Sequence, residues 1–198
     1  MPSLPNSPDT SDSLLLLNSI KGLGPVTYRN LLERFGSDPS AILAAPKSEL
    51  RTVRGVGEKI IDSLTSKNHA AWLSKERENL SKRRVFFLGK DSYPPLLNEI
   101  YDPPIGLYVG GQIPSGPYIS IVGTRSPTLY GLGFARKLAG QLAEMGFCIV
   151  SGMARGIDTA VHEGALDVQG KTLAFLGSGI DVVYPPENLG LYKKILEQ

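Results

Sequence analysis

The feature that most limits the fold of this 198-residue chain is an alternation of apolar and helical segments that begins at Tyr118. The apolar segments read YISIVG, FCIVSG, TLAFLG and DVVYP, and each is predicted to be a strand. Nearly continuous apolar strands with helices between them are typical of a parallel sheet covered on both faces. The sequence therefore predicts an α/β fold here. The helix after the first strand is expected to bury one face, formed by Ala135, Leu138, Ala139, Leu142 and Met145.

The first 84 residues have a different character, because glycine and proline separate short helical segments. Residues 1–12 contain three prolines and few large aliphatic side chains, which predicts a disordered tail. Residues 13–84 are expected to form a small all-helical domain, with Ser13 as the N-cap of the first helix and Pro25 opening the second. Residues 85–198 are expected to form the α/β domain, which includes two earlier strands, RVFFLG and IGLYVGG.

Three turns follow the first three apolar strands of the alternating region, and each contains glycine with hydroxyl or basic residues. Because the carboxyl ends of parallel strands meet at one edge of a sheet, where open α/β folds bind ligands, these turns are expected to lie together. Arg125 and Arg155 add planar guanidinium groups suited to phosphate. The glycine spacing of dinucleotide-binding turns, G-x-G-x-x-G, is absent. The predicted anion pocket consists of Gly123, Thr124, Arg125, Ser151, Gly152, Arg155, Gly156, Gly177 and Ser178.

Two similar glycine motifs, KGLGP and RGVGE, lie in the helical region. Each has a basic residue, then Gly-aliphatic-Gly, then a helix, which is the order of a hairpin whose backbone comes close to a partner. The amides at the start of the following helix can bind a phosphate, with Lys21 adding charge in the first motif. The alternative is a protein-interaction domain whose glycines only turn the chain. The predicted phosphate-binding residues of the two hairpins are Gly22, Gly24, Arg54, Gly55, Gly57 and Lys59.

The overall composition excludes several classes of protein. The 21 basic and 19 acidic residues leave a net charge of +2, so any contact with nucleic acid must come from local clusters of charge. The chain has a single cysteine, which excludes a disulfide framework and a cysteine metal cluster, and this residue, Cys148, is expected to be a buried thiol. No metal and no other cofactor is predicted. The LLLL run at 14–17 is too short to span a bilayer, so the sequence predicts a cytoplasmic protein without a membrane partner.

Asp158 and His162 are four residues apart and share a helix face close to the predicted pocket. Such a pair can act as acid and base, but no serine or cysteine nucleophile is placed beside it in the sequence. We interpret Asp158 as a helix cap and His162 as part of the pocket wall. The chain is therefore predicted to be a binding protein without catalytic residues, and not an enzyme.

Four segments of the chain resemble the DNA-processing protein A (DprA/Smf) family: YPPLLNEIYDPPIGLYVGG, SIVGTRSPTLYG, VSGMARGIDTAVHEGAL and GKTLAFLGSGIDVVYPPEN. The paired glycine motifs suit the helix-hairpin-helix, SAM-like domain that many members carry. The resemblance implies a Rossmann-like domain that binds single-stranded DNA, protects incoming DNA and helps load RecA on it during natural transformation. In the family, a Gly-Ser/Thr-Arg turn contributes to the pocket for DNA phosphates, here Gly123, Thr124 and Arg125. The stretch from Ser151 to Asp158 lines the same pocket.

Members of the family continue well beyond the segment YPPEN, so the parallel sheet is expected to be incomplete at its C-terminal end. The family's dimer contacts and RecA-contacting surface are attributed largely to that later part, and both partners are implied by the resemblance alone. Two other functions stay open. Related Rossmann-like folds bind nucleotides or hydrolyse nucleoside monophosphates with a carboxylate, a role that Asp158 or Glu163 would fill. The third alternative is a helical protein-interaction domain beside a sheet that has no ligand.

Overall fold

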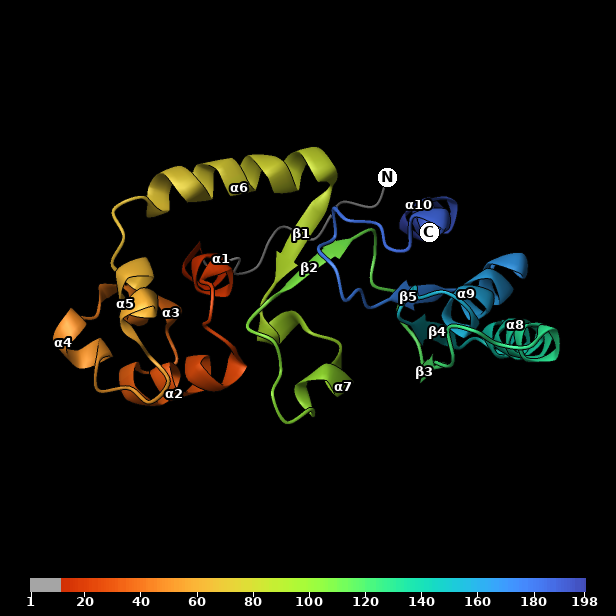
Figure 1. Cartoon of the computed structure of the whole chain (residues 1–198), viewed down its shortest axis with the longest axis horizontal. Coiled ribbons are helices and arrows are strands. Elements are labelled where there is room, and N and C mark those ends of the chain that lie inside the picture. The colour runs from red at the N-terminus through yellow and green to blue at the C-terminus, as the bar shows by residue number, and fades with distance from the viewer. Residues whose placement is uncertain (1–11) are drawn as a thin grey trace. The chain divides into compact units, whose positions relative to one another are not determined.

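The computed structural model describes residues 12–198, and the chain divides into two compact units between Tyr108 and Val109 (Figure 1). The predicted tail, residues 1–12, lies outside the described residues except for Asp12, which belongs to the first helix. The sequence predicts the boundary between the helical and the α/β domain at residues 84 and 85, which differs from the division into compact units after Tyr108. That domain boundary stays a prediction. None of the described helices has the length and apolar character needed to cross a lipid bilayer.

The first unit begins with a series of helices whose ends follow local sequence rules. Pro25 is the first residue of the second helix, and Gly36 ends that helix with a φ of +92°, a conformation that favours glycine. Ser13, the predicted N-cap of the first helix, lies inside it instead, because the helix already includes Asp12. The helices are α1 Asp12–Ser19, α2 Pro25–Phe35, α3 Pro39–Ala44, α4 Lys47–Leu50, α5 Glu58–Leu64 and α6 His69–Arg83.

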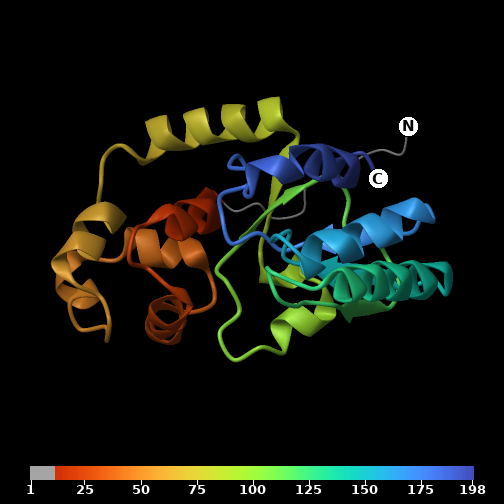
Figure 2. The same cartoon turned by 45° about the vertical axis from the view of Figure 1, so that its right-hand side comes forward.

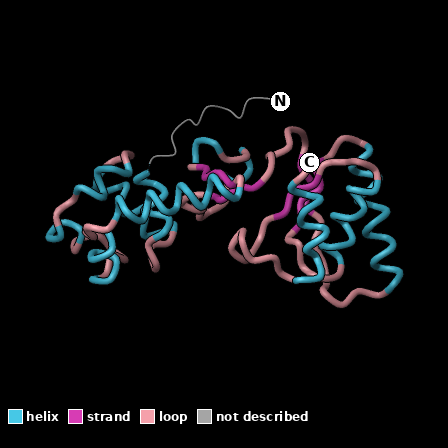
Figure 3. The backbone as a smooth tube through the Cα atoms, turned by 90° about the horizontal axis from the view of Figure 1, so that it is seen from above, coloured by secondary structure: helices cyan, strands magenta, loops and turns pink. Residues whose placement is uncertain are grey.

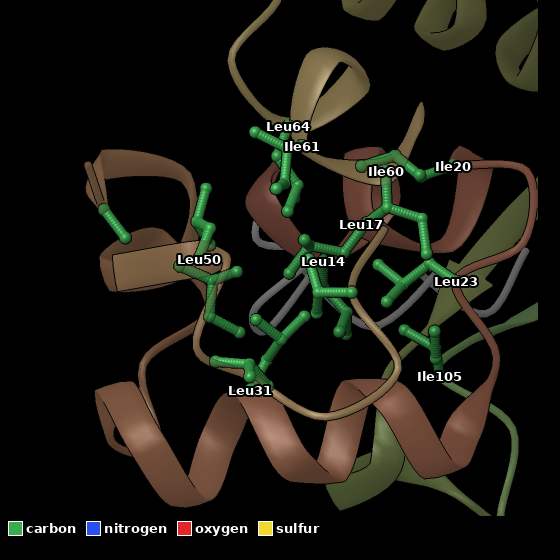
Figure 4. Close-up of a cluster of buried hydrophobic side chains, with 14 of the residues drawn as sticks. Leu14, Leu17, Ile20, Leu23, Leu31, Leu50, Ile60, Ile61, Leu64 and Ile105 are labelled. Carbon is green, nitrogen blue, oxygen red and sulfur yellow. The ribbon is translucent and has the colours of Figure 1, made fainter. Parts of the chain in front are cut away.

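The core of the first unit forms around α1, whose four leucines are all buried. Four consecutive leucines point to nearly every side of a helix, so this part of α1 belongs in the interior of its domain. Figure 4 shows leucine and isoleucine side chains from α1, α2, α4 and α5 pointing toward one another, among them Leu17, Leu31, Leu50 and Ile61. The LLLL run therefore supplies the core of the helical region.

A two-stranded sheet follows α6 and confirms both early strands predicted from the sequence. The rings of Phe87 and Tyr108, one from each strand, pack edge to face with 5.2 Å between their centroids. Gly106 leaves room for this packing, because a Cβ there would overlap the ring of Phe87. The elements of this segment are β1 Val85–Leu88, η1 Lys90–Ser92, α7 Pro95–Asn98 and β2 Leu107–Gly110.

The second unit is an α/β unit with a three-stranded, fully parallel sheet in the order β3-β4-β5. Ile149 on the central strand lies level with Ile119 on one neighbour and Thr172 on the other. Figure 2 shows α8 and α9 side by side, and Figure 3 shows the loops that join strands to helices. The elements are β3 Tyr118–Ser120, α8 Leu129–Glu144, β4 Cys148–Ser151, α9 Ile157–Asp167, β5 Thr172–Ala174, η2 Pro186–Asn188 and α10 Leu189–Leu196.

The core of the second unit lies between the sheet and these two helices. Ile149, Val161 and Ala165 are fully buried there, and α8 contributes small residues such as Ala139. Met145, predicted to belong to the buried face of α8, is exposed because it follows the last helical turn as the C-cap. Cys148 is buried as predicted, and burial raises the pKa of its thiol to about 11.

One expectation about the sheet was wrong. The segment DVVYP, residues 181–185, does not form a strand; it starts with a turn in which Val182 N–H donates to Gly179 O over 2.8 Å. Helices α8 and α9 pack against the face of the sheet that bears Ile119 and Ile149, and the cover of the other face stays a prediction. Just beyond β3, Ile121 packs against this core, whereas the next residue, Val122, is exposed.

Candidate functional site

The three predicted turns follow parallel strands, so each begins at the same edge of the sheet. The first two turns are in direct contact. The backbone N–H of Ile157 donates to Thr124 O over 3.2 Å, which ties the start of α9 to the turn after β3. The sequence prediction that these turns lie at one sheet edge is therefore confirmed for their backbone.

Two of the predicted glycines bring these turns together. Gly156 has a φ of +81°, and a Cβ there would overlap Thr124 O and lie 3.0 Å from Arg125 C. A Cβ on Gly123 would lie 2.7 Å from the Ile157 side chain. In this structure, both glycines thus allow one turn to approach the other.

The polar groups of the second turn already have partners within the protein. Ser151 Oγ, which is buried, donates to Ile121 O over 2.7 Å. The Asp158 carboxylate accepts from the backbone N–H groups of Gly152 and Ala154 at 3.2 and 3.3 Å. Asp158 therefore holds the loop before α9 and is not the helix cap expected from the sequence, because the N-cap position is Gly156.

Arg155, the second predicted cation, is also paired. Its guanidinium forms an ion pair with Glu187, in which Nη2 donates to Oε2 over 3.2 Å, and lies 5.7 Å from the centre of the Tyr184 ring. The hydrogen bond from Arg155 lowers the pKa of the Glu187 carboxyl. The charge of Arg155 is therefore compensated within the protein.

The third turn, 177–179, is satisfied locally. Ser178 Oγ donates to Val182 O over 2.9 Å, and the space where a Cβ on Gly177 would lie is open. Among residues 12–198, no hydrogen bond joins this turn to either of the other two. Among the described residues, the third turn thus begins at the same sheet edge without a hydrogen bond to either of the other turns.

Arg125 differs from these residues. It is exposed, and no ion pair or side-chain hydrogen bond to it occurs in the described part of the chain. Beside it, Thr124 Oγ1 accepts from Ser126 N–H over 3.1 Å, which leaves the hydroxyl proton available to an anion. The 16-residue helix α8 starts four residues later, capped by Thr128, and adds the positive end of its dipole. Arg125, Thr124 and the start of α8 form the candidate anion site.

His162 is fully buried and is not part of a pocket wall, in contrast to the sequence interpretation. Thr172 Oγ1 donates to Ile149 O over 2.8 Å, so it accepts from His162 Nδ1, 2.7 Å away. The ring is therefore protonated on Nδ1, and its Nε2 has no hydrogen-bond partner. Burial lowers the pKa of His162 to about 4, against the opposing effect of Asp158. The histidine is neutral at pH 7 and has a structural role.

This buried histidine predicts a loss of stability in mild acid. In the pH range between 6.5, the ordinary pKa of histidine, and about 4, this side chain is protonated in the unfolded chain and neutral in the folded chain. Stability should therefore be complete above pH 6.5 and fall toward pH 4, by up to about 3 kcal/mol from this group. Thermal melts of His162→Gln should show a smaller pH slope than the unchanged chain. His69→Gln should keep the slope, and equal slopes in both variants would contradict the assignment.

The two glycine motifs of the first unit adopt the same geometry. Gly22 and Gly55 have φ values of +89° and +90°, and the residues after them, Leu23 and Val56, are buried. Leu23 N–H donates to the carbonyl three residues earlier over 3.0 Å, and Val56 N–H does so over 3.2 Å. Gly24 and Gly57 then stand at the N-caps of α2 and α5, so the predicted repeat of two hairpins is confirmed.

The two hairpins lie side by side. Gly55 packs against Thr27, and the Asn30 side-chain amide donates to Arg54 O over 2.9 Å. Lys21, Arg54 and Lys59 are all exposed, whereas Glu58 at the start of α5 is paired with Arg51 at 2.7 Å. Exposed basic residues thus lie within four residues of two adjacent helix starts along the chain, and phosphate binding there stays a prediction.

These features define a class: tandem helix-hairpin-helix motifs followed by a parallel, Rossmann-like α/β unit with a basic turn at its carboxyl edge. Residues 84–198 match the family of DNA recombination-mediator protein A, and residues 14–67 match the SAM-like helix-hairpin-helix tandem. The chain belongs to the DprA/Smf family.

The most informative relatives agree on this assignment. The protein Smf of Synechocystis is 37% identical over 189 residues, which are 91% of this chain and 47% of the relative. DprA of Streptococcus pneumoniae is 42% identical over 120 residues, 60% of this chain and 41% of the relative. The chain thus spans about half the length, or less, of these curated relatives.

Solved structures show the same fold. The X-ray structure of DprA from Streptococcus pneumoniae aligns with a TM-score of 0.64 and 27% identity, over 95% of this chain and 65% of that one. A DprA structure from Helicobacter pylori, described for its single-stranded DNA binding mode, aligns with a TM-score of 0.52 and 32% identity. That alignment covers 59% of this chain and 53% of the other.

Proposed function

We propose that this chain is a DNA-processing protein that binds single-stranded DNA through its phosphate backbone. The observation that carries the proposal is the uncompensated Arg125 beside the start of α8, at the edge of a parallel sheet. A phosphate there would contact the guanidinium of Arg125, the hydroxyl of Thr124 and the positive N-terminal end of α8. Membership of the DprA/Smf family and the DNA-binding relative from Helicobacter pylori support the same ligand.

The wider role is proposed on family membership. We propose that the chain takes part in natural transformation as a cytoplasmic protein, protecting incoming single strands and assisting RecA loading, with homodimerisation as a further association. These activities belong to whole proteins of the family. This chain spans 47% of the Synechocystis relative, so each needs its own test on the chain itself.

Two observations favour a binding protein over a nucleoside-monophosphate hydrolase. Asp158, the first candidate carboxylate, is buried and accepts two backbone N–H groups. Glu163, the second, forms an ion pair with Arg136 at 2.8 Å. Both carboxylates therefore have structural partners, which supports roles in holding α9 and its loop.

Fluorescence anisotropy with a labelled oligo-dT strand tests the proposal against its rival. The chain should bind the single strand more tightly than a duplex of equal length, with affinity that falls as salt rises. AMP should neither compete at equal phosphate concentration nor release adenine. Tighter binding to the duplex, or adenine release, would contradict the proposal.

The hairpins are proposed to hold further phosphates, and Lys59 tests this. Lys59→Glu should weaken binding to all strand sequences alike and reduce the slope of log affinity against log salt by roughly one. Lys67→Glu is the matched control, because it reverses an exposed charge in the loop after α5. If both variants bind as the unchanged chain does, the helical region is a protein-interaction domain.

A further inference from the structure

The start of α8 exposes aromatic side chains that the sequence analysis did not single out. Tyr130 is 81% exposed and Phe134 is 56% exposed. Their rings are stacked, with 6.2 Å between centroids and 22° between planes. The buried side of α8 is formed by Ala135, Ala139 and Ala143, so these rings stand outside the core. Burial of rings of this size is normally favourable, so their exposure calls for a ligand.

The rings lie next to the candidate anion site along the chain. Thr128 caps α8, which places Tyr130 in the first helical turn, five residues after Arg125. Phe134 stands one turn further on, and Lys137, also exposed, follows it at a spacing that keeps the same side of the helix. A cation, two stacked rings and a second cation therefore follow one another.

We propose that Tyr130 and Phe134 form a platform on which unpaired bases stack while Arg125 holds the adjoining phosphate. This inference rests on the proposed function and adds how the site selects its ligand. Aromatic faces stack on any base, and flanking cations attract the strand backbone. In a duplex the bases already stack on each other, so the platform distinguishes single strands from double strands.

The cations argue for a nucleic acid over an apolar protein partner. An apolar helix docking here would bury Arg125 and Lys137 beside the rings and would have to supply carboxylates for them. A single strand supplies a phosphate for each cation and a flat base for each ring. A single strand of nucleic acid thus offers a partner to both cations and to both rings.

The test uses the 198-residue chain with two probes of equal length: oligo-dT and the same backbone carrying abasic sites. Tyr130→Ala and Phe134→Ala should each weaken oligo-dT binding about tenfold and leave the weaker abasic binding within about twofold. Tyr130→Phe, which keeps the ring, should bind as the unchanged chain does. Met145→Ala, an exposed apolar residue at the other end of α8, is the control and should also be unchanged. 2-Aminopurine within the strand should be quenched on binding, and less so by the alanine variants.

Three results would overturn the platform. If both alanine variants bind oligo-dT normally while Arg125→Ala does not, the phosphate site stands and the platform fails. If the alanine variants lose affinity equally for both probes, the rings contact the sugar-phosphate backbone of the strand or stabilise the protein fold, and they do not stack on bases. If the Tyr130→Phe variant is as weak as Tyr130→Ala, the hydroxyl is the binding group. A chain that binds neither probe would instead refute the proposed function itself.

Discussion

Gly156→Ala is expected to destabilise the second unit by about 3 kcal/mol or more and to lower its Tm by roughly 12–24 °C. Gly156 has a φ of +81°, where side-chain-bearing residues are strained. An added Cβ would overlap the carbonyl oxygen of Thr124 and lie 2.8 Å from Pro127 Cδ. Because one neighbour is backbone and the other a proline ring, the first turn itself would have to move.

The displaced turn carries Arg125, so Gly156→Ala should also weaken binding to oligo-dT at temperatures well below the melt. Gly177→Ala is the matched control at the same sheet edge, since a Cβ there meets nothing within 4 Å. Its stability should change by no more than about 0.5 kcal/mol. Thermal melting and anisotropy on the same preparations separate the two effects. Gly156→Ala melting with the unchanged chain would refute the close contact of the two turns.

The parts of the fold that follow from local pattern could be predicted. The apolar runs around Ile119, Ile149 and Leu173 became parallel strands, and glycine with proline correctly marked the start of α2. The segment DVVYP has the composition of a strand, but composition does not report hydrogen-bond partners. In the folded chain these residues begin in a turn, and the two prolines after Tyr184 lack the N–H that a strand needs.

The position of the candidate anion site could be predicted from the sequence, but the partners of its side chains could not. The parallel topology alone places the turns at one edge of the sheet. The pairing of Arg155 with Glu187, 32 residues later, is a tertiary contact that no local pattern reveals. The same holds for the exposure of Tyr130, which depends on where the core lies. The only local signal was that Tyr130 and Phe134 fall outside the apolar face of α8.

Arg125→Ala is expected to weaken single-stranded DNA binding roughly ten- to a hundredfold, because charge-assisted hydrogen bonds contribute about 1.5–3 kcal/mol each. The guanidinium has no partner in the described part of the chain, so its removal should leave the melt unchanged. Arg125→Lys should recover only part of the affinity, since lysine offers a point charge in place of a planar fork. Arg155→Ala should cost less affinity, because Glu187 already compensates that charge.

Lys193→Ala is the control for the loss of one positive charge, because it removes an exposed cation from α10 of the same unit. This variant should lose no more than the small affinity expected of a distant charge at physiological salt. Each variant is measured by anisotropy with oligo-dT and by thermal melting. If Arg125→Ala and Lys193→Ala bind alike, the site after β3 holds an anion other than DNA. If Arg125→Ala lowers the Tm instead, the arginine belongs to the fold, and Thr124 with the start of α8 loses its role as an anion site.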